Sequence, residues 1–279
     1  MSNHLQSVAA RVAVAALLAL ALIAVPVAAE KLEFKDPTGD DNGPGEYVYP
    51  TDAVYNPGSF DLTGLSVKTK GKNVDFSVDL NTRLEDPWNM GTGFSVQMIF
   101  IFIDTDGEEG SGNTETLPGL NVEFAPYHAW DKVVILSPQG ASRVKTEVEQ
   151  KVADLAGDIV IPGRVKGVNR SISARVKLEE LGGGDPSTWG YQVLVQSNEG
   201  FPSGGDLLTR KVNEFEGQHR FGGGNDYDCD PHVVDILAGS GSGSDDEVAA
   251  QHAQLAYECD AEGNASKRAT LTTVRKSAD

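Results

Sequence analysis

Alternating apolar and polar positions predict paired strands early in the chain. Residues 74–80 carry an apolar side chain at every second position, which is typical of a strand with one buried face and one solvated face. Residues 65–69 alternate in the same way, and the turn-forming sequence Lys-Gly-Lys-Asn separates the two segments at 70–73. The pattern therefore predicts an antiparallel hairpin.

The later strand-like segments favour an all-β fold. Residues 94–103 are apolar at almost every position, which predicts a central strand covered on both faces. Further strand-like stretches lie at 133–136, 159–161, 172–178, 191–195, 233–237 and 269–274. Their number, and the 31 glycines and 13 prolines along the chain, favour a β-sandwich over a helical bundle.

Helical and irregular segments are expected to be minor. Residues 146–155 and 247–257 predict two short helices that decorate the sandwich. The glycine-serine run at 239–244 predicts a flexible surface loop, and the polar tail after about 275 is expected to be disordered. The expectation is one β-sandwich domain over residues 30–279 with minor helical insertions.

The N-terminus has the layout of a signal peptide. Arg11 precedes an apolar run at 12–25, and the small-residue sequence Pro-Val-Ala-Ala follows at 26–29. The run is shorter than the roughly 20 residues that a spanning helix needs. We expect residues 1–29 to be removed and the remainder to be secreted or held at the cell surface, with no membrane insertion. An uncleaved anchor is the alternative.

The acidic balance narrows the choice of partners. The formal net charge is −18, from 23 basic and 41 acidic residues. A nucleic-acid partner is not expected, because phosphate binding needs clustered Lys and Arg. Carboxylates also supply the oxygen ligands that calcium prefers, although a solvated surface accounts for most of them.

Cys229 and Cys259 are the only cysteines. In an exported chain they predict a disulfide, which closes a loop of about 30 residues and has a nominal stabilisation of roughly 3 kcal/mol. Two unpaired thiols are the alternative, because the sequence does not show whether their Cα atoms lie close enough.

Two acidic loops are candidate calcium sites. Asp36, Asp40 and Asp41 lie in a segment rich in glycine and proline, which can wrap an ion or form an ordinary polar turn. In the second loop, Asp104, Asp106 and Glu115 take positions 1, 3 and 12 of a calcium-loop spacing. A helix-loop-helix is not expected there, because the preceding segment is strand-like. A solvated hairpin tip is the alternative to calcium in that loop.

Trp88, Trp130 and Trp189 are candidate sugar-stacking residues. Each is flanked by polar, turn-forming residues. Exposed aromatic rings stack on the apolar face of a sugar while polar neighbours bond its hydroxyls. The same tryptophans can instead seal the core at the ends of strands.

Catalytic chemistry has little support in the sequence. The histidines after residue 29 are His128, His219, His232 and His252, and none lies in a nucleophile or zinc motif. Carboxylate pairs leave a glycoside hydrolase open as an alternative. Haem ligation by Met90 or Met98 is a further alternative, but the apolar run around Met98 favours a core position.

An ordered set of motifs resembles a known family. The motifs are Asp-Pro-Thr-Gly-Asp-Asp-Asn-Gly-Pro-Gly-Glu-Tyr-Val-Tyr-Pro-Thr at 36–51, Pro-Gly-Ser-Phe-Asp-Leu at 57–62, Asp-Pro-Trp-Asn at 86–89, Gly-Phe-Ser-Val-Gln at 93–97, Thr-Glu-Thr-Leu-Pro-Gly-Leu-Asn at 114–121, Ala-Trp-Asp at 129–131, Trp-Gly-Tyr-Gln-Val-Leu-Val at 189–195, Glu-Gly-Phe-Pro at 199–202, Arg-Phe-Gly-Gly-Gly at 220–224 and Val-Asp-Ile-Leu at 234–237. Together they resemble the C-terminal module of glucodextranase and of some bacterial and archaeal pullulanases, a DOMON-like domain.

This resemblance implies an immunoglobulin-like antiparallel β-sandwich of the kind found in carbohydrate-binding modules. It also implies a polysaccharide or cell-envelope glycan as partner and a structural calcium ion at Asp36, Asp40 and Asp41. Tyr47 and Tyr49 join the carbohydrate-binding candidates. We therefore expect a secreted, non-catalytic, calcium-stabilised binding module that acts beside a separate secreted glycosidase. A haem- or redox-associated domain and a glycoside hydrolase are the alternatives.

Overall fold

The computed structural model describes residues 31–202 and 204–276. The expected leader at 1–29 and the end of the expected tail at 277–279 lie outside the described residues. The described part of the tail is attached to the body, since the Lys276 ammonium lies 4.9 Å from the centre of the Phe34 ring. Among the described helices, none has the length and apolar character that a bilayer-crossing segment needs.

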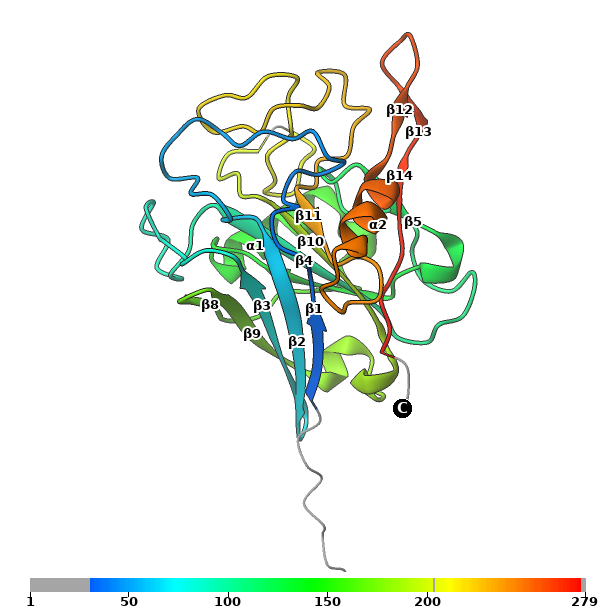
Figure 1. Ribbon diagram of the computed structural model, residues 1–279. Coiled ribbons are helices and arrows are strands. Elements are labelled where there is room, and N and C mark those ends of the chain that lie inside the picture. Colours follow the sequence, from blue (N-terminus) through cyan, green and yellow to red (C-terminus); the bar gives the residue numbers. More distant parts are fainter. Residues whose placement is uncertain (1–30, 203, 277–279) are drawn as a thin grey trace, which may run out of the picture.

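Two five-stranded sheets form the sandwich (Figure 1). The first sheet is fully antiparallel. Its strands, in spatial order, are β1 (Lys31–Lys35), β2 (Leu62–Lys70), β3 (Asn73–Leu80), β9 (Ser171–Lys177) and β8 (Val165–Val168). The second sheet has the order β11 (Asp235–Ile236), β10 (Gly190–Ser197), β4 (Gln97–Asp104), β6 (Lys132–Leu136) and β7 (Ile159–Val160). Only the β6–β7 pair in it is parallel.

The strand patterns place two hydrophobic cores. Strand β3 alternates buried and half-buried residues as expected, and its apolar side chains face the second sheet. All eight residues of β4 are buried. Ile99, Ile101 and Ile103 pack between the two sheets, whereas Met98, Phe100 and Phe102 point into a second core. The prediction of a central strand covered on both faces is confirmed, and Met98 is a core residue.

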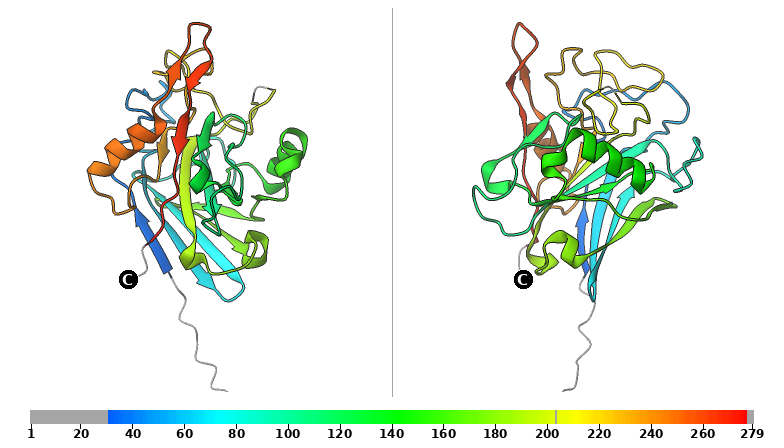
Figure 2. Two further views of the ribbon diagram at one scale, coloured as in Figure 1. Left: turned by 90° about the vertical axis from the view of Figure 1, so that its right-hand side faces the viewer. Right: turned by 180° about the vertical axis from the view of Figure 1, so that it is seen from behind.

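Short elements cover the outer face of the second sheet. Helix α1 (Ala141–Lys151) buries Val144 and Val148 in the second core, and α2 (Asp246–Leu255) buries Leu255 there. Figure 2, right, shows α1 crossing in front of the strands. The remaining elements are β5 (Val122–Phe124), β12 (Glu258–Cys259), β13 (Ala265–Lys267), β14 (Ala269–Leu271) and the 3-10 turns η1 (Pro126–His128), η2 (Ala153–Leu155), η3 (Leu178–Leu181) and η4 (Pro186–Thr188).

The expected elements are found with shifted ends. The hairpin of β2 and β3 is confirmed, with Lys70 paired to Asn73 across the turn. The segment at 233–237 contributes only two residues to a strand, and that at 269–274 only three. Helix α1 begins at Ala141, five residues before the expected start.

The glycine-serine run at 239–244 is not a flexible loop. Its backbone N–H groups converge on the Glu247 carboxylate: Ser240 donates at 2.8 Å, Gly243 at 2.7 Å and Ser242 at 3.1 Å. Gly239, Gly241 and Gly243 have positive φ angles, and such a backbone turns successive N–H groups to one side, where they bind an anion. The expectation failed because composition alone does not show the carboxylate around which the loop folds.

Long loops gather at one end of the sandwich. We call this the loop end and define it as residues 36–61, 81–96 and 198–234, which are the blue and yellow loops at the top of Figure 1 and the cyan loop at its left. Backbone hydrogen bonds join its segments, from Thr51 N to Gly217 O (3.0 Å) and from Asn198 N to Val96 O (2.7 Å). The loop end holds most of the predicted site residues.

Candidate functional site

Two of the three candidate tryptophans are buried. Trp130 and Trp189 are inaccessible to solvent, and Trp130 packs edge-on to Phe102 with its Nε1 donating to the Glu115 carbonyl at 2.9 Å. The expectation that these two rings stack on a sugar is wrong. Their polar flanking residues form turns at strand ends while the indole rings point inward, so these tryptophans seal the core.

The two candidate tyrosines also pack and hydrogen-bond within the protein. Tyr47 is buried, and its hydroxyl donates to the Pro231 carbonyl. Tyr49 is half-buried, packs 5.0 Å from the Phe221 ring and donates to Asp41. These contacts fasten the first loop-end segment to the others, so neither tyrosine offers a free ring face and the expectation for both is corrected.

Trp88 alone among the tryptophans keeps part of its ring exposed. It lies on the segment between β3 and β4, with Tyr55 and His219 against it at centroid distances of 6.4 and 6.2 Å. The Arg210 guanidinium lies 5.9 Å from the ring centroid, a distance at which a cation is attracted to a ring face. Trp88 is therefore a partly open ring on a fixed support.

Charged groups behind Trp88 hold that support. Arg210 is almost fully buried and pairs with Glu199 at 3.1 Å, and it donates to the Tyr55 hydroxyl at 2.9 Å. Glu199 also accepts the N–H of Phe201 at 3.0 Å. Arg210 thus connects the segment after β10 to Tyr55 and to Trp88, and it leaves no unpaired charge beneath the ring.

The sequence reasoning missed three exposed rings of the loop end. Phe201, Phe215 and Tyr227 are 93%, 71% and 72% exposed. Exposed aromatic side chains on loops are common in binding surfaces. The signal that could have found them is an isolated aromatic residue in a stretch otherwise composed of glycine, asparagine and charged residues.

Buried carboxylates meet beneath the loop end. Asp36 follows β1, Asp40 lies four residues later and Asp235 begins β11. All three are buried, and one carboxylate oxygen from each lies within 4.8 Å of the others. We call these residues the Asp36 cluster. It brings together the predicted Asp36 and Asp40 with Asp235, which the sequence reasoning did not select. An acid inside the apolar run 233–238 was the available signal.

Part of the cluster's hydrogen-bonding capacity is unused. Asp235 accepts backbone N–H groups of Leu62 (2.7 Å) and Ile236 (2.8 Å). One oxygen each of Asp36, Asp40 and the neighbouring Asp61 has no hydrogen-bond partner, although all three residues are buried. Within the described part of the chain, no Lys or Arg pairs with these four carboxylates.

Burial and mutual repulsion perturb the acidity of the cluster. Burial, followed by the charge of Asp40, raises the pKa of Asp36 to about 9. Burial also raises the pKa of Asp40 to about 6, and the pKa of Asp235 lies well above its usual range for the same reason. Uncompensated charges of one sign in a dry site are strongly unfavourable. The cluster therefore favours either bound protons or a bound cation.

The donor set fits calcium. Calcium takes six to eight oxygen ligands, including carboxylates and backbone carbonyls, and tolerates irregular geometry. Three carboxylates supply the negative charge, and the unpartnered oxygens of Asp36 and Asp40 are available as ligands. Asp41, predicted as a ligand, lies outside the cluster because its carboxylate accepts the Tyr49 hydroxyl. That part of the prediction is corrected.

In the second acidic loop, an arginine side chain already neutralises part of the negative charge. Asp104 and Asp106 lie close to Asp131, but the Arg275 guanidinium pairs with Asp104 at 2.5 Å. Glu115, expected to complete this loop, instead pairs with Arg268 at 2.7 Å, so its assignment as a ligand is corrected. Because a protein side chain supplies the positive charge here, the Asp36 cluster is the stronger metal candidate.

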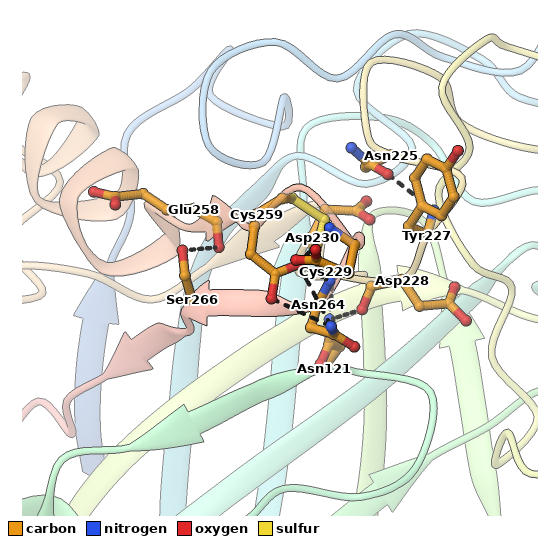
Figure 3. Close-up of a disulfide and its surroundings, with 12 residues drawn as sticks. Asn121, Asn225, Tyr227, Asp228, Cys229, Asp230, Glu258, Cys259, Asn264 and Ser266 are labelled. Atoms are coloured by element: carbon orange, nitrogen blue, oxygen red, sulfur yellow. Dashed lines mark hydrogen bonds between the residues drawn. A yellow bond between two sulfur atoms is a disulfide. The ribbon is translucent and has the colours of Figure 1, made fainter.

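A disulfide fastens the last loop of the loop end. Cys229 and Cys259 are bonded, with their Cα atoms 5.6 Å apart, which confirms the predicted pair. Figure 3 shows the bond joining the 228–230 segment to β12, with Asn121 donating to the carbonyls of Asp228 (2.8 Å) and Asp230 (2.6 Å). The cross-link and the asparagine together hold the segment that leads into β11 and Asp235.

The protein is thus a sandwich whose loop end is cross-linked by a disulfide, carries the half-buried Trp88 and covers a carboxylate cluster that no Lys or Arg of the described residues neutralises. A comparison with curated proteins gave no match to the chain. A family model described as the SLH-like C-terminal binding module of glucodextranase matches residues 32–273. The match covers nearly all of the described residues and agrees with the all-β sandwich, so this chain belongs to the glucodextranase C-terminal binding-module family.

Proposed function

We propose that this chain is an exported, non-catalytic module that binds polysaccharide through Trp88 and neighbouring exposed rings of the loop end, and that a calcium ion in the Asp36 cluster stabilises that end. The observation that carries the proposal is the partly open Trp88 ring in a chain of a binding-module family. A ring supported from behind by Tyr55 and Arg210 can stack on a sugar, while polar groups of the surrounding loops bond the sugar hydroxyls.

Calcium has a mechanical role in this proposal. The Asp36 cluster joins the end of β1 to the start of β11, and Asp235 also accepts the N–H of Leu62 at the start of β2. An ion there connects both sheets at the root of the 36–61 segment. That segment carries Tyr55, which packs against Trp88. Loss of the ion is expected to loosen the support of the ring as well as the fold.

Export is supported by two independent features. Arg11 precedes the apolar run at 12–25, and small residues follow at 26–29, where a signal peptide is cleaved. The Cys229–Cys259 bond is of a kind that persists in oxidising compartments. The module's place is then outside the cytoplasm, on the cell envelope or beside a secreted glycosidase.

Affinity electrophoresis tests the ring assignment. Migration of the protein through gels containing dextran or cell-wall polysaccharide is expected to be retarded, and Trp88→Ala is expected to weaken binding by about tenfold or more, as for a central aromatic anchor. Tyr127→Ala is the matched control, because Tyr127 is an exposed ring on η1, outside the loop end. Circular dichroism checks that both variants fold.

Unchanged retardation of Trp88→Ala would contradict the assignment. The non-catalytic part is tested on the same samples by assaying reducing ends after incubation. No release is expected, and release of reducing sugar that follows the purified protein would overturn it.

A further inference from the structure

The outer face of the first sheet carries an ordered arrangement of polar side chains. The register aligns Lys31, Lys68, Asp75 and Arg175 in one row across β1, β2, β3 and β9. The next row along the strands contains Glu33, Ser66, Ser77, Ser173 and Lys166. Figure 1 views this face, and no helix crosses it. A row of serines is thus bordered by cations on an open sheet.

This face is hollowed. A cavity of about 1060 Å³ lies over the strands, and Gly163 and Arg164 of the segment before β8 form one side of it. Its lining includes the serines of the central row and Ser171. The only aromatic side chain in the lining is Phe76, whose ring is buried in the core. The hollow is therefore built for hydrogen bonds and charge rather than for ring stacking.

The charge of the hollow is opposite to that of the chain. Five cationic side chains and two carboxylates line it, whereas the whole chain has 23 basic against 41 acidic residues. Arg175 is paired with Asp75 and Lys31 with Glu33. Lys68, Arg164 and Lys166 are exposed, and within the described residues no hydrogen bond or ion pair involves their side chains. The charge of Lys68 does act on the neighbouring Asp75, whose pKa it helps to lower after the stronger effect of Arg175. These three cations are available to a ligand.

We propose that this hollow is a second binding site, separate from Trp88, for a carboxylate-bearing polysaccharide that lies across the strands along the serine row. The cations attract the carboxylates, and the Ser66 and Ser77 hydroxyls can donate to and accept from sugar hydroxyls. The Ser171 and Ser173 hydroxyls donate to Asp79 and to the Lys166 carbonyl, so they remain acceptors for a sugar. Five strands spaced about 4.8 Å apart extend roughly 19 Å, enough for several consecutive sugar residues. A neutral glycan would leave the three cations without partners.

The same observations disfavour a nucleic acid. Single-stranded nucleic acids are held by aromatic side chains on which bases stack, and this face presents none. A duplex brings dense phosphate charge to a protein whose remaining surface is strongly acidic. A linear acidic polysaccharide has a lower charge density and many hydroxyls, which suits a groove of alternating hydroxyl and cationic groups.

Binding to polygalacturonate tests the proposal. The folded chain is expected to bind it at low salt and to lose affinity in about 0.5 M salt, where screening is strong. The triple variant Lys68→Gln, Arg164→Gln, Lys166→Gln is expected to bind about tenfold more weakly, the cumulative effect of three surface charges. A matched triple, Arg83→Gln, Lys145→Gln, Lys267→Gln, changes the net charge equally at exposed positions outside the hollow.

The readouts separate this proposal from the one on Trp88. Dextran binding is expected to be unaffected by the hollow triple, and polygalacturonate binding is expected to be unaffected by Trp88→Ala. Equal loss in the two charge triples would show a general charge effect and overturn the site. Equally tight binding of polyuridylate that the hollow triple also abolishes would overturn the polysaccharide assignment. Absence of polygalacturonate binding would do the same.

Discussion

Two adjacent regions of this protein bury carboxylates and differ in how those carboxylates are stabilised. Glu247 is buried, yet its carboxylate accepts four backbone N–H groups and the Ser240 hydroxyl. Burial opposes ionisation of Glu247, but those hydrogen bonds outweigh it and hold its pKa at about 2. The Asp36 cluster lies deeper and has unpartnered oxygens, and its pKa values are raised to about 9 at Asp36 and about 6 at Asp40.

The difference shows how many buried carboxylates the backbone can satisfy with N–H donors. A glycine-rich turn can surround one carboxylate with N–H donors because alternate positive φ angles point them inward. In the Asp36 cluster, backbone N–H groups reach both oxygens of Asp235, but one oxygen each of Asp36 and Asp40 has no partner. In the second arrangement either bound protons or a bound cation must offset the repulsion, and calcium is the cation that we propose because its preferred ligands match the donor set.

The largest expected effect is calcium removal. At free calcium about a thousand times its Kd, binding to the folded state alone adds about 4 kcal/mol to the free energy of unfolding. We expect a chelator to lower the free energy of unfolding by that amount, and with it the denaturant midpoint. Magnesium should restore less of this stability than calcium does, because magnesium demands octahedral geometry. Chemical unfolding followed by tryptophan fluorescence measures this. Equal midpoints with and without chelator would contradict the proposal that calcium stabilises the Asp36 cluster.

Substitution in the cluster should remove most of that gain. Asp235→Asn keeps the shape of the side chain but removes a carboxylate ligand. We therefore expect calcium to raise the free energy of unfolding of this variant by less than about 1 kcal/mol. Asp154→Asn, an exposed acid on η2, is the control and should retain the full calcium shift.

Glu247→Gln should behave in the opposite way. Loss of charge-assisted hydrogen bonds to the glycine-serine run should cost about 2 kcal/mol. The cost should be the same with and without calcium, because the backbone and not an ion satisfies this group. Unfolding curves of the variant in both conditions measure it. A cost that appears only in calcium would mean that Glu247 belongs to the metal site.

A further expected effect is a pair of opposing pH dependences in chelator. The pKa of Glu247 is lowered from its usual 4.5 to about 2, so its contribution to stability is present above pH 4.5 and is lost as the pH falls toward 2. The pKa of Asp40 is raised from 3.8 to about 6, so its contribution is present below pH 3.8 and is lost as the pH rises through 6. Calcium should flatten the second slope only, as shown by unfolding midpoints across this range.

The sequence predicted the sheets better than the sites. The hairpin of β2 and β3 and the fully buried β4 follow from period-two and continuous apolar patterns, because side-chain alternation is a local property of a strand. The Cys229–Cys259 pair was also predictable, since only two cysteines exist. The number of strand-like segments already favoured a sandwich, and the family motifs implied the same architecture.

The misplaced site residues share one cause, which is that ligand sets depend on contacts distant in the chain. Asp235 joins Asp36 from 199 residues away, and no local pattern reports that approach. Trp130 and Trp189 have polar neighbours but inward-facing rings, because flanking residues indicate the turn and not the direction of the side chain. Glu115 fits a calcium-loop spacing, yet Arg268, 153 residues later, captures it.

Calorimetric titration of calcium into chelator-treated protein tests the central claim most directly. We expect one tightly bound ion per chain in the unaltered protein and in Glu247→Gln, and an affinity at least about 300-fold weaker in Asp235→Asn. An unaltered protein that binds no calcium, or an Asp235→Asn variant that binds it as tightly as the unaltered protein, would contradict the assignment of the Asp36 cluster as a metal centre.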